Sequence, residues 1–124
     1  MQSTFDAIVQ AHRVVREATD AILQAQEREG ALAALGQLAD ILPEHFAWEE
    51  RPGGYFEHIE RTWTDGRRLV QALRSEHQSL LRDLEDLSAR PPEDTAFLDD
   101  ARTFSRRLRA HERKEARLGA EPGP

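Results

Sequence analysis

Prolines and glycines gather at a few places in this chain, and their spacing is the strongest constraint on its fold. The helix breakers fall at Gly30, at residues 52–54, at residues 91–92 and from Gly119 onward. Between them lie four long segments rich in Ala, Leu, Glu, Arg and Gln, which are good helix formers. β-branched residues do not alternate over any run long enough for a strand. The sequence therefore predicts an all-α chain.

Apolar residues recur every three or four positions in each segment, as on the buried face of a helix. We expect helices over about residues 3–30, 31–49, 64–90 and 97–118, with residues 55–59 as one or two turns beyond a kink. Ser3 or Thr4 should cap the first helix and Thr64 the third. Pro43 lies inside the second helix and should bend it or make it locally irregular.

Short connections between the four predicted helices favour an up-down-up-down antiparallel four-helix bundle. The 124 residues are enough for one domain with a core, and not for two. We expect this domain to span residues 1–119. Residues 120–124 are rich in proline and glycine and should form a flexible tail.

Composition excludes several classes of protein. Cysteine is absent, which excludes disulfides, thiolate metal sites and a cysteine nucleophile. The net charge of -6 argues against non-specific nucleic-acid binding, which requires a basic surface. No apolar run approaches the roughly 20 residues that cross a bilayer, and the N-terminus lacks the pattern of a signal peptide. The expectation is a cytoplasmic protein that binds neither nucleic acid nor membrane.

Four histidines occupy positions of the apolar stripes where Leu or Phe is expected: His12, His45, His77 and His111. They lie 33, 32 and 34 residues apart, and a helix breaker falls near the middle of each interval. In an up-and-down bundle each interval climbs one helix and descends the next. The four imidazoles should therefore meet in one layer of the core.

A glutamate follows two of these histidines at a distance of four residues, as His45–Glu49 and His111–Glu115. On a helix this spacing places both groups on one face, about one turn apart. Each buried polar group without a partner costs several kcal/mol, whereas a small domain has only about 5–15 kcal/mol of stability. A pair of cations would compensate directly. Nitrogen and carboxylate ligands without sulfur suit iron, manganese or zinc.

The arrangement His, His-x-x-x-Glu, His, His-x-x-x-Glu on four helices resembles the hemerythrin-like (HHE cation-binding) domain. The resemblance covers the chain from Thr4 to about Leu118 and includes the stretches HFAWEE at residues 45–50 and PGGYF at residues 52–56. It implies a non-heme diiron centre bridged by oxo or hydroxo and by Glu49 and Glu115. The terminal ligands that it implies are His12, His45, His77 and His111. Manganese or zinc would be the alternative metals.

The resemblance also implies a function, namely binding or sensing of oxygen, nitric oxide, peroxide or iron. The chain departs from the oxygen-carrying branch of the family, which has a further histidine one turn before His77, where this sequence has Leu73. That branch also places an Asp five residues after its last histidine, whereas Glu115 comes four residues after His111. Reversible oxygen storage is therefore not the expected role.

Three other residues are candidates for completing the metal's ligands: Tyr55, His58 and Glu112. His58 lies nine residues beyond Glu49, roughly 14 Å along a straight helix, so only a sharp kink would bring it back. Core packing, hydrogen bonding or a solvated surface is the favoured role for each of the three.

Two other functions remain open. A diiron oxidase or peroxidase with true turnover is favoured by the missing imidazole at Leu73, which would leave a coordination position open. A metal-free helical interaction module is the other. No histidine has Glu three residues before it, as in ferritin-like oxidases, and the zinc-protease, Gly-x-Ser-x-Gly and P-loop motifs are absent. An enzyme is therefore not the principal expectation.

Overall fold

The computed structural model describes residues 4–120, and the side chains of residues 10–119. Its helices are α1 (Thr4–Gln24), α2 (Arg28–Glu50), α3 (Tyr55–Thr62), α4 (Gly66–Ser88) and α5 (Phe97–Ala120). No strand occurs in this part of the chain. The all-α prediction is confirmed.

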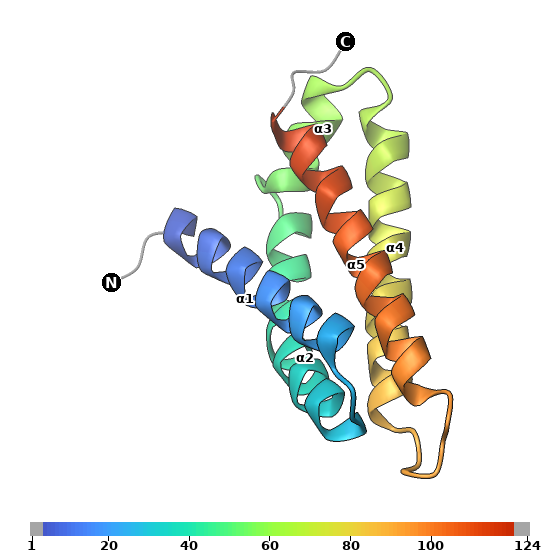
Figure 1. Cartoon of the computed structure of the whole chain (residues 1–124). Helices are drawn as coiled ribbons and strands as arrows, with labels where there is room; N and C mark the ends of the chain where they lie inside the picture. The colour runs from blue at the N-terminus through green and yellow to red at the C-terminus, as the bar shows by residue number, and fades with distance from the viewer. Residues whose placement is uncertain (1–3, 121–124) are drawn as a thin grey trace.

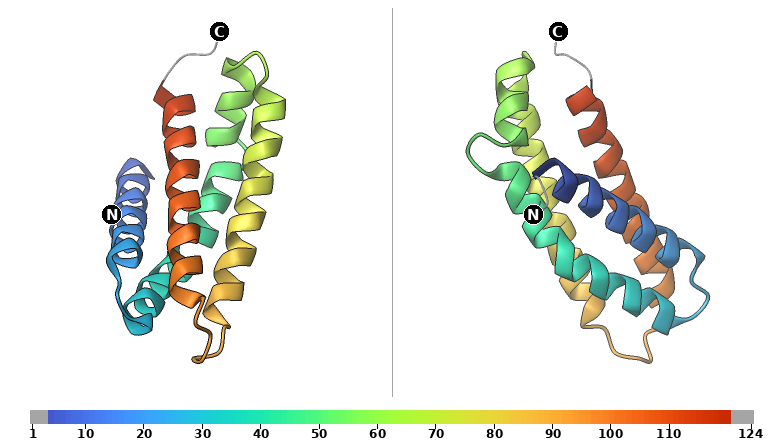
Figure 2. Two further views of the ribbon diagram at one scale, coloured as in Figure 1. Left: turned by 45° about the vertical axis from the view of Figure 1, so that its right-hand side comes forward. Right: turned by 90° about the vertical axis from the view of Figure 1, so that its left-hand side faces the viewer.

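The four long helices run alternately down and up, and the short α3 extends the path of α2 beyond a turn at residues 51–54 (Figure 1). Helix α1 packs against α2 and α5 and not against α4. Its N-terminal end leans away from the other helices, which Figure 2 shows from two further sides. The predicted antiparallel bundle is confirmed, with α1 as its least enclosed member.

Some helix boundaries differ from the prediction. The first helix ends at Gln24, and Gly30 lies in the first turn of α2. The chain breaks earlier than expected because Glu27, at the N-cap of α2, takes an extended conformation. A glycine is tolerated in a first turn, where the backbone N–H groups have no partner within the helix. The N-cap of α4 is Asp65, so the prediction of Thr64 was wrong by one residue.

Helix α2 continues without a break through Pro43, which is exposed. Ala120 belongs to α5. The rest of the predicted flexible tail, residues 121–124, lies outside the described residues, as does the predicted cap at Ser3. Among residues 4–120, no helix combines the length and the apolar character that a membrane span requires.

The core consists of two apolar clusters with a polar layer between them. The larger cluster fills the end of the bundle near the α1–α2 and α4–α5 turns and includes Phe46, Leu80 and Leu108. The smaller one lies beneath α3 and includes Leu73 and Leu118. Along α4 and α5 the predicted ligands come between members of the two clusters, so the fold buries them on both sides.

Gly66 allows α4 to begin close against the end of α3. A Cβ atom at this position would lie 2.4 Å from the carbonyl oxygen of Ile59 and 2.6 Å from the Cα of Glu60. Only glycine fits this approach without moving the backbone. The tight turn holds α3 over the polar layer.

Candidate metal centre

Helices α2, α4 and α5 bring five of the six predicted ligands into one buried layer: His45, Glu49, His77, His111 and Glu115. They face one another because each lies on the inward stripe of its helix, in the register that the apolar neighbours set. The most exposed of the five is Glu49, at 8%. The layer is therefore closed off from bulk water.

The two glutamates lie between the imidazoles. Glu115 Oε2 is 3.3 Å from Nε2 of His77 and 3.3 Å from Nε2 of His111. Glu49 Oε1 is 3.2 Å from Nε2 of His77, and Glu49 Oε2 is 3.8 Å from Nε2 of His45. One ligand atom from each of Glu49, His77, His111 and Glu115 lies within 4.8 Å of the others, so a single cation would fit among them. We call this group the first position.

His12 is exposed, so the prediction that it occupies a core position was wrong. Helix α1 turns Ala11 and Val15 inward and leaves His12 at the edge of the bundle. Its ring nevertheless meets that of His45 edge-on, at 4.9 Å between centroids. Ligand atoms of His12, His45 and Glu49 form a second group within 4.8 Å, which we call the second position.

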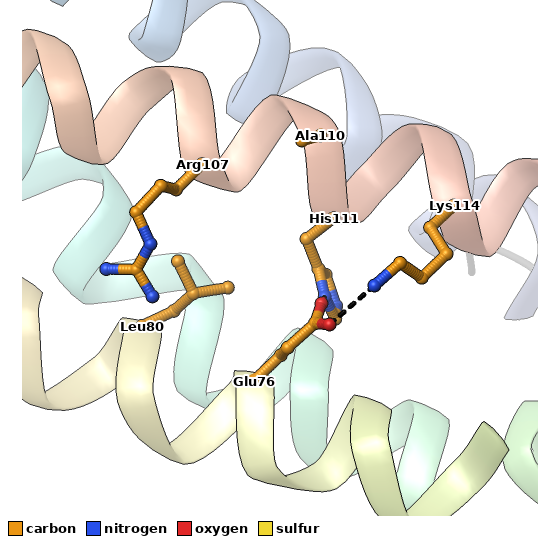
Figure 3. Close-up of a pocket in the computed structure, with 6 residues that line it drawn as sticks. All are labelled: Glu76, Leu80, Arg107, Ala110, His111 and Lys114. Carbon is orange, nitrogen blue, oxygen red and sulfur yellow. Dashed lines mark hydrogen bonds and ion pairs between the residues drawn. The ribbon is translucent and has the colours of Figure 1, made fainter.

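Two further carboxylates accept hydrogen bonds from Nδ1 of two imidazoles, on the side of each ring away from the centre of the layer. Glu50 Oε2 lies 2.8 Å from Nδ1 of His77, and Glu76 Oε1 lies 2.6 Å from Nδ1 of His111. Figure 3 shows Glu76 reaching from α4 toward His111 and Lys114 of α5. With Nδ1–H donating to a carboxylate, each ring turns the lone pair of Nε2 toward the centre, as metal-ligating histidines do.

Sequence reasoning assigned no role to Glu50 or Glu76. Each follows or precedes a predicted ligand in the chain but hydrogen-bonds a histidine on a different helix. Glu50 of α2, for example, accepts a hydrogen bond from His77 of α4. The signal available in the sequence was an acidic residue directly beside Glu49 and another beside His77.

Aromatic rings fix the orientation of His77. Phe46 stacks on it at 3.7 Å between centroids and 5° between planes, and Phe56 stacks at 5.1 Å. Leu73, where oxygen carriers have a further histidine, is buried in the apolar cluster beneath α3. This side of the first position therefore offers hydrocarbon in place of a donor atom.

Burial and neighbouring charges shift the pKa values of four groups in the layer. Burial raises the pKa of Glu49, and the nearby Glu115 adds to this effect. Burial opposes ionisation of Glu115 as well, but the adjacent imidazoles of His111 and His77 outweigh it and lower its pKa. Burial alone would lower the pKa of His77, yet Glu115, Glu49 and Glu50 together raise it to about 9. Burial lowers the pKa of His45 to about 4.

Three buried atoms of the layer have no hydrogen-bond partner among the described residues: His45 Nε2, Glu49 Oε1 and His111 Nε2. Unpartnered buried polar atoms are rare and costly, and a cation is the partner that suits two imidazole nitrogens and a carboxylate oxygen together. A nitrogen and oxygen donor set without sulfur fits iron, manganese or zinc.

A cavity of about 620 Å³ adjoins the second position. His12, His45, Glu49 and Glu115 border it, whereas His77 and His111 do not. Its remaining walls come from α2, the 51–54 turn, α3 and the end of α5, and include Trp48, Tyr55, His58, Ala116 and Gly119.

Of the three remaining candidate ligands, Tyr55 and His58 line this cavity and Glu112 does not. The Tyr55 hydroxyl donates a hydrogen bond to the backbone carbonyl of Glu115. This bond joins α3 to α5 at the position of a predicted ligand. His58 is exposed and belongs to none of the metal-compatible groups among the described residues. Glu112 is half-buried, and it forms a third such group with His45 and Glu115.

Comparison with known proteins decides the family. A family model described as the hemerythrin HHE cation binding domain matches residues 3–118, nearly the whole chain. The chain belongs to this family. The resemblance drawn from the histidine and glutamate spacing is thereby confirmed, as is the helical bundle. No curated protein and no solved structure matches the chain. This hemerythrin-like domain thus combines a cation-binding fold with a buried His/Glu group compatible with metal.

Proposed function

We propose that this hemerythrin-like domain holds two iron ions in its polar layer and uses them to bind or sense a small ligand, namely oxygen, nitric oxide or peroxide, or iron itself. The first position would hold one ion and the second position the other. Glu49 belongs to both groups. Glu115 belongs to the first position and also to a group with His45 and Glu112, so both carboxylates are candidates to be shared by the two ions.

The observation that carries this proposal is the set of three unpartnered buried atoms, His45 Nε2, Glu49 Oε1 and His111 Nε2. A bundle stabilised by packing alone would have apolar side chains at these positions. The carboxylates behind His77 and His111 add support, because they select the tautomers that expose Nε2 to a cation.

Iron, when bound, supplies redox capacity and a coordination position that a small ligand can occupy. The protein itself determines from which side a small ligand can reach each ion. Leu73 and Phe56 close the first position with hydrocarbon, whereas the cavity reaches the second position past His12. A small ligand therefore approaches from the α1 side of the bundle.

Elemental analysis of protein purified without chelator tests the proposal. We expect about two irons per chain, a loss of iron in His77→Ala, and unchanged iron in His58→Ala, which removes an imidazole outside the ligand groups. An optical spectrum of the reduced protein, recorded before and after exposure to air or nitric oxide, would then identify the ligand. Metal-free protein, with His77→Ala melting at the wild-type temperature, would favour the interaction module and refute the proposal.

One observation favours turnover as a second candidate function. The cavity is far larger than a diatomic ligand, and its walls include the polar side chains of Tyr55 and His58 beside the predicted ligands. A diiron oxidase or peroxidase would use such a space for a reducing substrate. Steady-state consumption of peroxide or oxygen by iron-loaded protein tests this function, and full iron loading without turnover would exclude it.

A further inference from the structure

Glu112 adds a carboxylate beside His45, one of the ligands of the second position. It follows His111 on α5, is half-buried, and places a carboxylate oxygen within 4.8 Å of ligand atoms of His45 and Glu115. Glu112 and His12 also line one hollow between α1 and α5. The carboxylate therefore stands on the side of the layer where His12 meets His45.

An independent observation points to a ligand at this place. The His45 side chain is only 3% exposed, and its Nε2 has no hydrogen-bond partner among the described residues. The neighbouring Glu112 carboxylate does not satisfy it as a salt bridge would. A buried imidazole nitrogen and a carboxylate oxygen that stand close without bonding are suited to share a cation.

The alternative is that Glu112 is a surface acid neutralised by an arginine. No basic side chain among the described residues forms an ion pair with it. Arg109, on the same stretch of α5, instead pairs with Asp20 of α1 at 2.7 Å. Arg16 and Arg109 are near enough to attract the Glu112 carboxylate, but neither forms an ion pair with it. The carboxylate therefore remains beside His45.

We propose that Glu112 ligates the second ion together with His12 and His45. The inference rests on the proposed two-ion centre. It assigns a carboxylate, and not a further imidazole, as the group that completes the ligands in a chain with leucine at position 73. The second ion would then be bound by a more anionic set than the first.

A Co²⁺ titration of the metal-free protein tests this role, because Co²⁺ reports both affinity by calorimetry and coordination by its visible absorption. Wild-type protein should take up two ions. In Glu112→Gln we expect the Kd of one ion to rise at least about tenfold, with an altered cobalt spectrum, while the Kd of the other stays the same. Glu85→Gln, the same change on an exposed face of α4, is the matched control and should leave both Kd values unchanged.

Melting temperatures separate a ligand from a structural residue. Glu112→Gln removes a negative charge beside Glu115, so the metal-free variant should melt at or above the wild-type temperature, while its gain on Co²⁺ binding should shrink. Glu112→His, which offers a nitrogen donor, should recover part of the lost affinity. Two ions bound by Glu112→Gln with wild-type Kd values would overturn the inference and leave the two-ion centre intact. A wild-type protein that binds one ion or none would overturn both.

Discussion

Raising the pH from 7 to 8 should tighten metal binding to this domain by about fiftyfold. In the metal-free protein the pKa of His77 is raised to about 9 and that of Glu49 lies above neutrality, so both groups carry a proton at pH 7. A cation binds their deprotonated forms and must displace both protons. Between pH 7 and 8, a proton displaced from a pKa of about 9 changes the apparent affinity about ninefold and one displaced from a pKa of about 8 changes it about fivefold. The two together give about fiftyfold.

The same protons set the stability of the metal-free protein. Both groups have folded pKa values above their ordinary values of 6.5 for His77 and 4.5 for Glu49. Their stabilising contribution is therefore present at low pH and is lost as the pH rises through the folded pKa values. Between pH 7 and 8 the free energy of unfolding should fall by about 1 kcal/mol per group. The metal-loaded protein, already deprotonated at these groups, should not show this fall.

Calorimetric titration with Co²⁺ in two buffers of different ionisation enthalpy counts the released protons directly. We expect about two per loaded chain at pH 7. Thermal melts at pH 7 and pH 8 should show that the gain in melting temperature on metal binding widens as the pH rises. An affinity that is the same at both pH values, or release of fewer than about half a proton per chain, would refute this account of the layer.

Three further predictions concern the groups around the centre. Glu50→Gln and Glu76→Gln should each weaken metal binding about 10- to 100-fold in chelator competition, because an imidazole loses the carboxylate at its Nδ1. Phe46→Ala should lower the free energy of unfolding in urea by about 3–5 kcal/mol, since it removes a buried ring from the core and from the face of an imidazole. Gly66→Ala should cost about 1–3 kcal/mol in the same assay, because its Cβ would meet the backbone of α3, whereas Gly36→Ala, with open space around it, should stabilise α2 by about 0.5–1 kcal/mol.

Helical periodicity accounts for what the sequence could predict. Glu49, His77, His111 and Glu115 stand in stripes whose other members are apolar, so the burial of those neighbours fixed the burial of these polar groups. The four long helices are similar in length, at 21 to 24 residues, and this similarity brought the groups to one height. The same reasoning failed for His12, because periodicity along α1 does not tell how the helix rotates against its neighbours.

The hydrogen bonds between carboxylates and Nδ1 of the imidazoles could not be predicted, for a related reason. The role of Glu50 depends on the distance between α2 and α4, and that of Glu76 on the distance between α4 and α5. Side chains directly beside a buried residue usually lie at the boundary of a helix face, where the sequence favours neither solvent nor a partner. Only the packing of the helices decides between them.

The loose placement of α1 bears on how long each metal ion would stay in the protein. Release from the first position requires ligands on α2, α4 and α5 to separate, which amounts to opening the buried layer. At the second position one ligand, His12, is exposed and lies on α1, a helix that packs on two neighbours, so this ligand can move away without opening the buried layer. Local openings of this kind cost less free energy than opening a core. Of two ions in this bundle, the one beside α1 should therefore exchange first, and a centre with two different metals could form by replacement at that position alone.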